Sequence, residues 1–154
     1  MRRTASVLLI AMSTVADISF SSEYERLSFN FESYAAEGLE GSYTGLKCER
    51  VNIDHVVSLK DAHDSGAHSW TSEAKEIFAN DRKNHLVACR SVNSSKGSAG
   101  PKDFLRRSRD GVGIDYKIVN FCGYVDLYYT IKVSYGLSFE SNDSEIFGAC
   151  GIEI

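Results

Sequence analysis

An aspartate and a histidine stand side by side at the end of an alternating apolar run, Val51-Asn52-Ile53-Asp54-His55-Val56-Val57. A carboxylate can hold a metal ion, and an imidazole that titrates near neutral pH can take a proton from water. Together they form a hydrolytic pair. Further along the chain come Asn84 and the segment Asn93-Ser94-Ser95-Lys96-Gly97. Folded onto Asp54 and His55, that segment would complete a candidate site for cleaving phosphodiesters.

The elements that must position these residues are short. Alternation from Val51 to Leu59 predicts a strand or a two-stranded ribbon, with Asp54 and His55 on opposite faces near its end. Leu86-Val87-Ala88-Cys89 predicts a short buried strand. A short helix is expected to open at Asn93 and to end at Gly97.

Helices are expected on either side of this region. Thr71 is a typical N-cap for a helix that runs to Ala79. Pro101 suits the first position of a helix from Pro101 to Arg107. The stretch from Asp115 to Tyr135 is ambiguous, because its apolar residues keep helical spacing while its Tyr- and Val-rich end favours a strand.

Length and charge limit the classes of protein. The 154 residues have room for one domain with a modest core, and the formal net charge of −4 gives no overall support for binding a polyanion. The stretch from Asp81 to Arg109 is a local exception that could lie against phosphates, or could be a solvated helix face. Its eight cations, against the acids Asp81 and Asp103, are Arg82, Lys83, Arg90, Lys96, Lys102, Arg106, Arg107 and Arg109.

The first residues resemble an export signal. Arg2 and Arg3 precede the apolar stretch from Ala5 to Met12, and the small residues Thr14 and Ala16 follow. We therefore predict a signal peptide over residues 1–22, a single domain over residues 23–154, and a secreted or periplasmic location. The alternative is a buried N-terminal strand or helix. The stretch is too short to span a membrane, and no other segment is expected to do so.

Four cysteines, Cys48, Cys89, Cys122 and Cys150, contain no C-x-x-C pair, which argues against a zinc site. In an exported protein they predict two disulfides. Three pairings are possible and the sequence does not select one, although Cys48–Cys89 with Cys122–Cys150 is preferred. Without export, all four could be reduced thiols in the core.

The order of these motifs resembles the HNH endonucleases, and most closely the exported bacterial HNH nucleases. The similarity runs from about Tyr43 to Pro101, and it is specific because many positions match in one order. The matching positions are Asp54-His55-Val56-Val57-Ser58-Leu59, Ala62, Ser65-Gly66-Ala67, Trp70, Phe78-Ala79-Asn80-Asp81, Asn84, Asn93-Ser94-Ser95-Lys96-Gly97 and Pro101.

The resemblance implies an α+β fold with a ββα-metal core over about residues 48–100, additional helices and disulfide staples. It implies that His55 is the general base and that Asp54 and Asn93 are ligands of one divalent cation, usually Mg²⁺, with Mn²⁺ as an alternative. Asn84 would hold the ribbon and orient the base. Because Asn93 replaces the family's last histidine, an all-oxygen ligand set favours these hard cations over zinc.

The roles of three other polar residues are less specifically predicted. Lys96 is a candidate contact for the scissile or a neighbouring phosphate, with a solvated helix residue as the alternative. Arg90 is a second candidate for substrate binding. His85, where relatives carry an apolar residue, is expected to be a half-exposed surface histidine, or else a group that supports the site from behind.

The function expected from these residues is that of a secreted or periplasmic, metal-dependent and largely nonspecific endonuclease. Its substrate would be DNA, with RNA left open, and no feature requires an obligate protein partner or a membrane. One alternative is an antibacterial toxin nuclease on the same fold. Another is an extracellular binding module that keeps the scaffold without catalysis.

Overall fold

The computed structural model describes residues 22–32, 40–104 and 117–154. The predicted signal peptide lies almost wholly outside them, as does the second half of the helix expected from Pro101. The observed elements are, in chain order, η1 (Arg26–Phe29), β1 (Val51–His55), α1 (Leu59–Asp64), η2 (Ala67–Ser69), α2 (Ser72–Asn80), η3 (Arg82–Asn84), β2 (His85–Cys89), α3 (Arg90–Lys96), α4 (Phe121–Ser134) and α5 (Ser144–Gly148).

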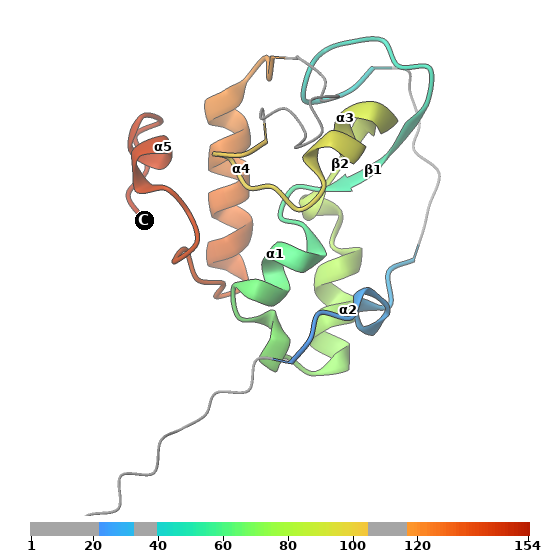
Figure 1. The fold of residues 1–154 in the computed structure, drawn as a ribbon, viewed down its shortest axis with the longest axis vertical. Helices are drawn as coiled ribbons and strands as arrows, with labels where there is room; N and C mark the ends of the chain where they lie inside the picture. Colours follow the sequence, from blue (N-terminus) through green and yellow to red (C-terminus); the bar gives the residue numbers. More distant parts are fainter. Residues whose placement is uncertain (1–21, 33–39, 105–116) are drawn as a thin grey trace, which may run out of the picture.

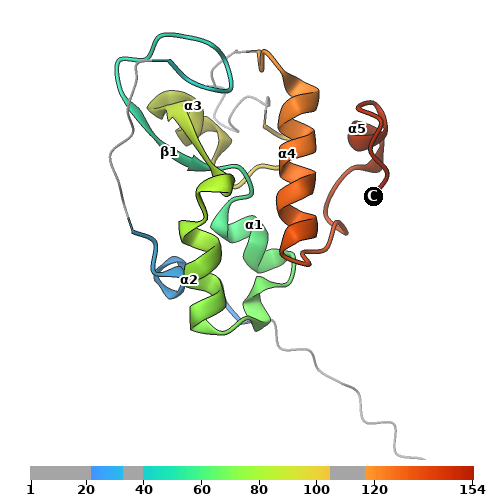
Figure 2. The same cartoon turned by 180° about the vertical axis from the view of Figure 1, so that it is seen from behind.

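Strands β1 and β2 form an antiparallel ribbon, in register from Val51 opposite Cys89 to His55 opposite His85. The connection between them holds α1 and α2, and α3 follows β2 without a break. The ribbon and α3 gather at one end of the molecule, α4 runs along one flank, and α5 lies outside α4 (Figures 1 and 2). The coarse prediction of an α+β chain is therefore correct.

Strand β1 is shorter than its alternation predicts. It ends at His55 because Ser58 turns the chain into α1, where the Ser58 hydroxyl accepts a hydrogen bond from the amide of Asp61. Strand β2 begins one residue before the predicted Leu86. Helix α2 begins as predicted, with the Thr71 hydroxyl capping the amide of Ala74 at 3.2 Å.

Two helical predictions need correction. Helix α3 begins at Arg90, so Asn93 lies in its middle turn rather than at its start. Residues 101–104 form a turn instead of opening a helix.

The stretch whose secondary structure the sequence left open, from Asp115 to Tyr135, contains helix α4. The buried residues of this helix repeat at helical spacing and form one face against the core. They are Tyr124, Val125, Tyr128, Ile131 and Lys132.

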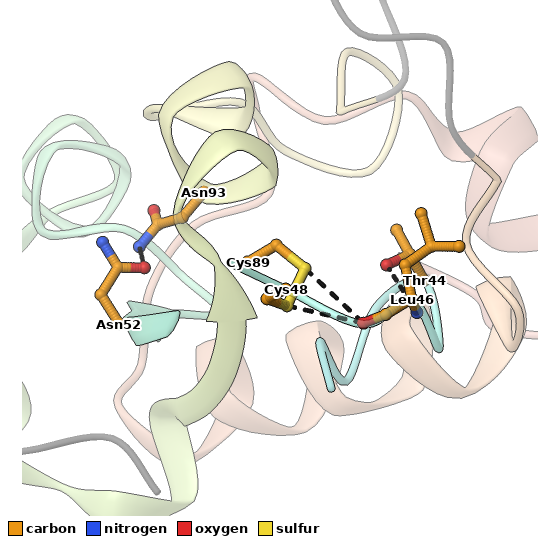
Figure 3. The surroundings of a disulfide bond; sticks show 6 residues. All are labelled: Thr44, Leu46, Cys48, Asn52, Cys89 and Asn93. Carbon is orange, nitrogen blue, oxygen red and sulfur yellow. Dashed lines mark hydrogen bonds between the residues drawn. A yellow bond between two sulfur atoms is a disulfide. The ribbon is translucent and has the colours of Figure 1, made fainter. Parts of the chain in front are cut away.

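The two disulfides have the preferred pairing. Cys48 is bonded to Cys89 at the foot of the ribbon, and Cys122 is bonded to Cys150, joining α4 to the chain after α5. Figure 3 shows the first of these directly beside the ribbon. The ribbon and the C-terminal helices are therefore each held by a covalent cross-link.

Candidate functional site

A cavity of about 300 Å³ lies where β1, α1 and α3 meet. Asp54 and His55 line it from β1, and Asn93 lines it from α3. The structure therefore brings together the three residues on which the proposed hydrolytic site depends. The other residues that line the cavity are Tyr24, Arg26, Ile53, Ser58, Leu59, Lys60, Gly97 and Ser98.

Asp54 is 5% exposed and is held by two donors on one oxygen. The Tyr43 hydroxyl donates to Asp54 Oδ2 at 2.6 Å, and Lys96 Nζ lies 3.0 Å from the same atom. Within the described residues, Asp54 Oδ1 makes no hydrogen bond. One carboxylate oxygen therefore anchors the side chain, and the other is left for a ligand.

Lys96 is 1% exposed, so it is not the solvated helix residue that was one of the two expectations. Its ammonium donates to the backbone carbonyl of His55 at 2.7 Å and pairs with Asp54. It also lies 5.8 Å from the ring centre of Phe104. The amine is thus committed to protein partners, and its role here is to position Asp54 and the end of β1 rather than to meet a phosphate.

The His55 ring is held so that one nitrogen is defined. Nε2 lies 2.7 Å from the carbonyl oxygen of Ala79, which can only accept, so Nε2 carries the hydrogen. Nδ1 then carries the lone pair, and it has no hydrogen-bond partner in the part of the chain that the structure describes. Phe31 packs edge-on against the ring, with centroids 4.8 Å apart. This is the tautomer of a base that can accept a proton at Nδ1.

Burial lowers the pKa of His55 to about 4, because the charged imidazolium is poorly solvated in this site. His55 is therefore neutral at pH 7. The hydrogen bond to Ala79 opposes this effect, and the neighbouring His85 adds to it.

His85 is buried rather than half-exposed, with 9% of its surface accessible. Its Nε2 donates to the same Ala79 carbonyl at 2.9 Å, and its ring lies edge-on to His55 with centroids 4.6 Å apart. The sequence-based expectation of a surface histidine is wrong. His85 faces His55 directly across the ribbon, and it supports that ring from behind.

Asn93 also has a defined orientation. Its Nδ2 donates to Asn52 Oδ1 at 3.0 Å and to the Ile53 carbonyl at 3.2 Å. Figure 3 shows the amide nitrogen turned toward Asn52 and the oxygen turned away. Within the described residues, Asn93 Oδ1 accepts no hydrogen bond, so it is a second oxygen left for a ligand.

Asn84 is fully buried and clamps the two strands together. Its side chain accepts from the amide of Val57 at 2.9 Å and donates to the carbonyl of Val57 at 3.0 Å. Its own carbonyl accepts from the amide of Val56 at 2.8 Å. Asn84 thereby fixes the chain just after His55 to the start of β2, and among the described residues its side chain bonds Val57 rather than the His55 ring.

The donor set is suited to a hard cation. Asp54 and Asn93 line one cavity, each has an oxygen without a hydrogen-bond partner among the described residues, and Mg²⁺ and Mn²⁺ prefer oxygen ligands. The described residues contain no cluster of three or more His, Cys, Asp or Glu side chains that could enclose a metal. A cation held by two protein oxygens would complete its shell with water and phosphate, as Mg²⁺ commonly does.

Sequence reasoning missed several residues that make this geometry. Asn52 had a detectable signal, because it lies two residues before Asp54 and therefore on the same face of β1. Tyr43 and Phe31 had no such signal, because an aromatic residue is assigned to the hydrophobic core unless the polar group or ring that it contacts is known. Arg26 lines the cavity from η1 and is exposed, far in sequence from the motifs.

Over 93 residues the chain is 37% identical to a protein of Arthroderma benhamiae described as an "Uncharacterized secreted protein". The match covers 59% of this chain, which spans only 41% of that relative's length. No protein-family model matches the sequence, and no solved structure matches it.

The protein is secreted, in agreement with the sequence-based prediction. The relative is a secreted protein, and both predicted disulfides are formed, as is typical of proteins from oxidising compartments. No helix within the described ranges is long and apolar enough to cross a membrane.

Proposed function

We propose that this protein is a secreted, metal-dependent nuclease that hydrolyses phosphodiester bonds, with DNA as the first substrate class. One observation carries the proposal. A neutral histidine lines the same cavity as Asp54 and Asn93, and within the described residues the histidine Nδ1 and one side-chain oxygen of each partner make no hydrogen bond. The strand–strand–helix order of β1, β2 and α3 supports it, because a ββα core is what the HNH resemblance implies.

His55 acts as the general base. Its Nδ1 accepts a proton from the water that attacks phosphorus, while the Ala79 carbonyl holds the Nε2–H and stabilises the imidazolium that forms. Asp54 and Asn93 would hold a divalent cation, and such a cation neutralises charge that develops on the phosphate oxygens. Asn84 and His85 are positioning residues that keep β1 and the His55 ring in place.

Lys96 was expected to contact a phosphate of the substrate, and in this proposal a different residue makes that contact. Arg26 is exposed and lines the cavity, and a guanidinium can donate two parallel hydrogen bonds to a phosphate. Lys60 also lines the cavity, but its amine is paired with Asp64 at 2.5 Å. Arg26 is therefore the residue best placed to meet the substrate.

The test is cleavage of supercoiled plasmid by the purified secreted protein with Mg²⁺, with and without EDTA. His55→Ala should lower the rate by about 10²–10⁴-fold, the usual contribution of a general base. His68→Ala is the matched control, because that histidine is exposed and does not line the cavity. Full activity in His55→Ala, or cleavage that persists in EDTA, would remove the proposal.

A second readout separates the base from the metal ligands. Binding of Mn²⁺, followed by electron paramagnetic resonance, should persist in His55→Ala and should weaken strongly in Asn93→Ala. If both variants bind Mn²⁺ like the wild type, Asn93 is not a ligand.

A further inference from the structure

A second hollow, which we call the basic groove, lies beside the cavity along α3 and has a volume of about 480 Å³. Three exposed cations line it, Lys47, Arg50 and Arg90, together with the serines Ser91 and Ser94. Glu49 is the one carboxylate among its lining residues. The groove is therefore positive, in a chain whose net charge is −4.

The backbone brings the two arginines of the groove, Arg50 and Arg90, side by side. The ribbon pairs Val51 with Cys89, and the Arg90 amide extends the pairing by donating to the Arg50 carbonyl at 2.9 Å. Arg50 and Arg90 stand just beyond the paired strands, and like charges held side by side repel each other. The disulfide between Cys48 and Cys89 cross-links the same two chain segments and keeps the arginines together.

In the described part of the chain, neither arginine of this pair forms an ion pair. The ion pairs found there use Lys60, Lys96, Lys102 and Lys132, and none of them involves Lys47, Arg50 or Arg90. An exposed arginine pair with no carboxylate partner is suited to an anion, and a phosphate accepts two parallel hydrogen bonds from each guanidinium. The hydroxyls of Ser91 and Ser94 are further donors of the kind that contact a nucleic-acid backbone.

The groove adjoins the cavity. On α3, Asn93 lines the cavity while Arg90 and Ser94 line the groove, and at about 100° per residue Arg90 and Ser94 lie in the sector of the helix next to Asn93. Along the ribbon, Arg50 lies about 13 Å from Asp54, since a strand rises about 3.3 Å per residue. Along the axis of a duplex, where one strand advances about 3.4 Å per nucleotide, that span corresponds to roughly four nucleotides.

We infer that the basic groove binds a backbone phosphate of the same nucleic-acid strand whose scissile phosphate enters the cavity. The inference rests on the proposed function for the identity of the ligand. The Arg50–Arg90 pair holds the strand in place without reading its sequence, because phosphate contacts position a duplex but do not distinguish bases.

The experiment measures binding without cleavage. Anisotropy of a fluorescein-labelled DNA duplex is followed in EDTA over a series of salt concentrations. Arg50→Ala/Arg90→Ala should weaken binding about tenfold or more and should reduce the slope of log affinity against log salt by about 0.9, since the pair neutralises one phosphate and each neutralised phosphate contributes about 0.9. Lys75→Ala/Lys83→Ala, which removes the same charge outside the groove, should leave that slope unchanged.

A slope that is unchanged in the arginine variant, or reduced equally in both variants, would overturn the inference. The melting temperature of the arginine variant should equal or exceed that of the wild type, because opposed charges are removed. A lower value would contradict the argument from those charges.

The inference and the proposed function can fail separately. If the protein cleaves plasmid and neither cleavage nor binding depends on the arginine pair, the proposed nuclease function is supported and the phosphate-binding role of the groove is rejected. Binding that depends on the pair, in a protein that never cleaves with Mg²⁺, would support the groove and reject the nuclease. A protein that binds no duplex in any of these conditions contradicts both.

Discussion

The molecule builds the same trio of side chains twice, once beside the cavity and once against α4. In each, an aspartate whose side chain is largely covered accepts from a tyrosine hydroxyl and pairs with a lysine that is fully enclosed. The two trios are Asp54 with Tyr43 and Lys96, and Asp61 with Tyr128 and Lys132. Because the two trios contain the same residue types, a comparison between them shows what distinguishes a ligand-binding site from a cluster that only stabilises the fold.

The difference lies in the oxygen atoms that remain. Both oxygens of Asp61 are occupied, Oδ2 by Tyr128 and Oδ1 by Ser65 at 3.1 Å and by Lys132 at 3.3 Å. Both donors to Asp54 use Oδ2, so its Oδ1 has no hydrogen-bond partner within the described residues. A saturated carboxylate fastens α1 to α4, whereas a half-saturated one keeps the capacity to bind a ligand.

Removing either lysine should give the largest effect on stability. Lys96→Met and Lys132→Met each leave a largely covered carboxylate without its counter-charge, and each should lower the free energy of unfolding by about 3–5 kcal/mol. Urea denaturation in EDTA measures both losses.

Added Mg²⁺ then separates the two variants. It should restore part of the stability of Lys96→Met, because Asp54 can exchange one cation for another and a ligand that binds only the folded state stabilises it. Lys132→Met should not respond. An equal response of both variants would show that the two trios do not differ as described.

The second-largest effect is expected from acid, which should lower the free energy of unfolding through the buried histidines beside the cavity. Burial lowers the folded pKa of His55 to about 4, below the value of about 6.5 expected in the unfolded chain, and it also lowers the pKa of His85. A depressed folded pKa stabilises the protein above pH 6.5, and this stability is lost as the pH falls toward 4. For His55 alone the loss is about 3 kcal/mol, at 1.36 kcal/mol per pKa unit.

The measurement is urea denaturation in EDTA at a series of pH values between 7.5 and 4, with the His55 ring proton followed by NMR. Its resonance should titrate near pH 4. A His55 resonance that titrates near 6.5 would mean that the ring is solvated and not held by Ala79.

The tyrosines should give the smallest effects. Tyr43→Phe and Tyr128→Phe each remove a hydrogen bond to a carboxylate, worth about 1.5–3 kcal/mol. Only Tyr43→Phe should change the affinity for Mn²⁺, raising it, because Asp54 then keeps more of its charge for the cavity. A change of Mn²⁺ affinity in Tyr128→Phe would contradict the assignment of Asp61 to a structural role.

Local signals in the sequence predicted the local structure well. The Thr71 cap, the strand ending at Cys89 and the helical spacing that became α4 each depend on residues close together in the chain. The start of α3 was misplaced because Arg90 follows β2 directly, and residue preferences do not mark such an abrupt change from strand to helix.

For the site, the sequence predicted which residues gather but not what holds them. Asp54, His55 and Asn93 were expected together, and all three line one cavity. The partners that orient them come from distant segments, as Tyr43 does for Asp54 and the Ala79 carbonyl does for His55. A hydrogen bond across 24 residues leaves no pattern in the chain.

By itself, the sequence determined the types of side chain available for chemistry, the order of the main elements and the oxidising destination of the four cysteines. The tertiary structure alone decided which atoms remain free. It turned Lys96 inward onto Asp54, selected the His55 nitrogen that keeps its lone pair, and set Arg50 beside Arg90. The reason is physical: hydrogen bonds and burial form between residues that are close in space, and those contacts decide which polar atoms are left for a ligand.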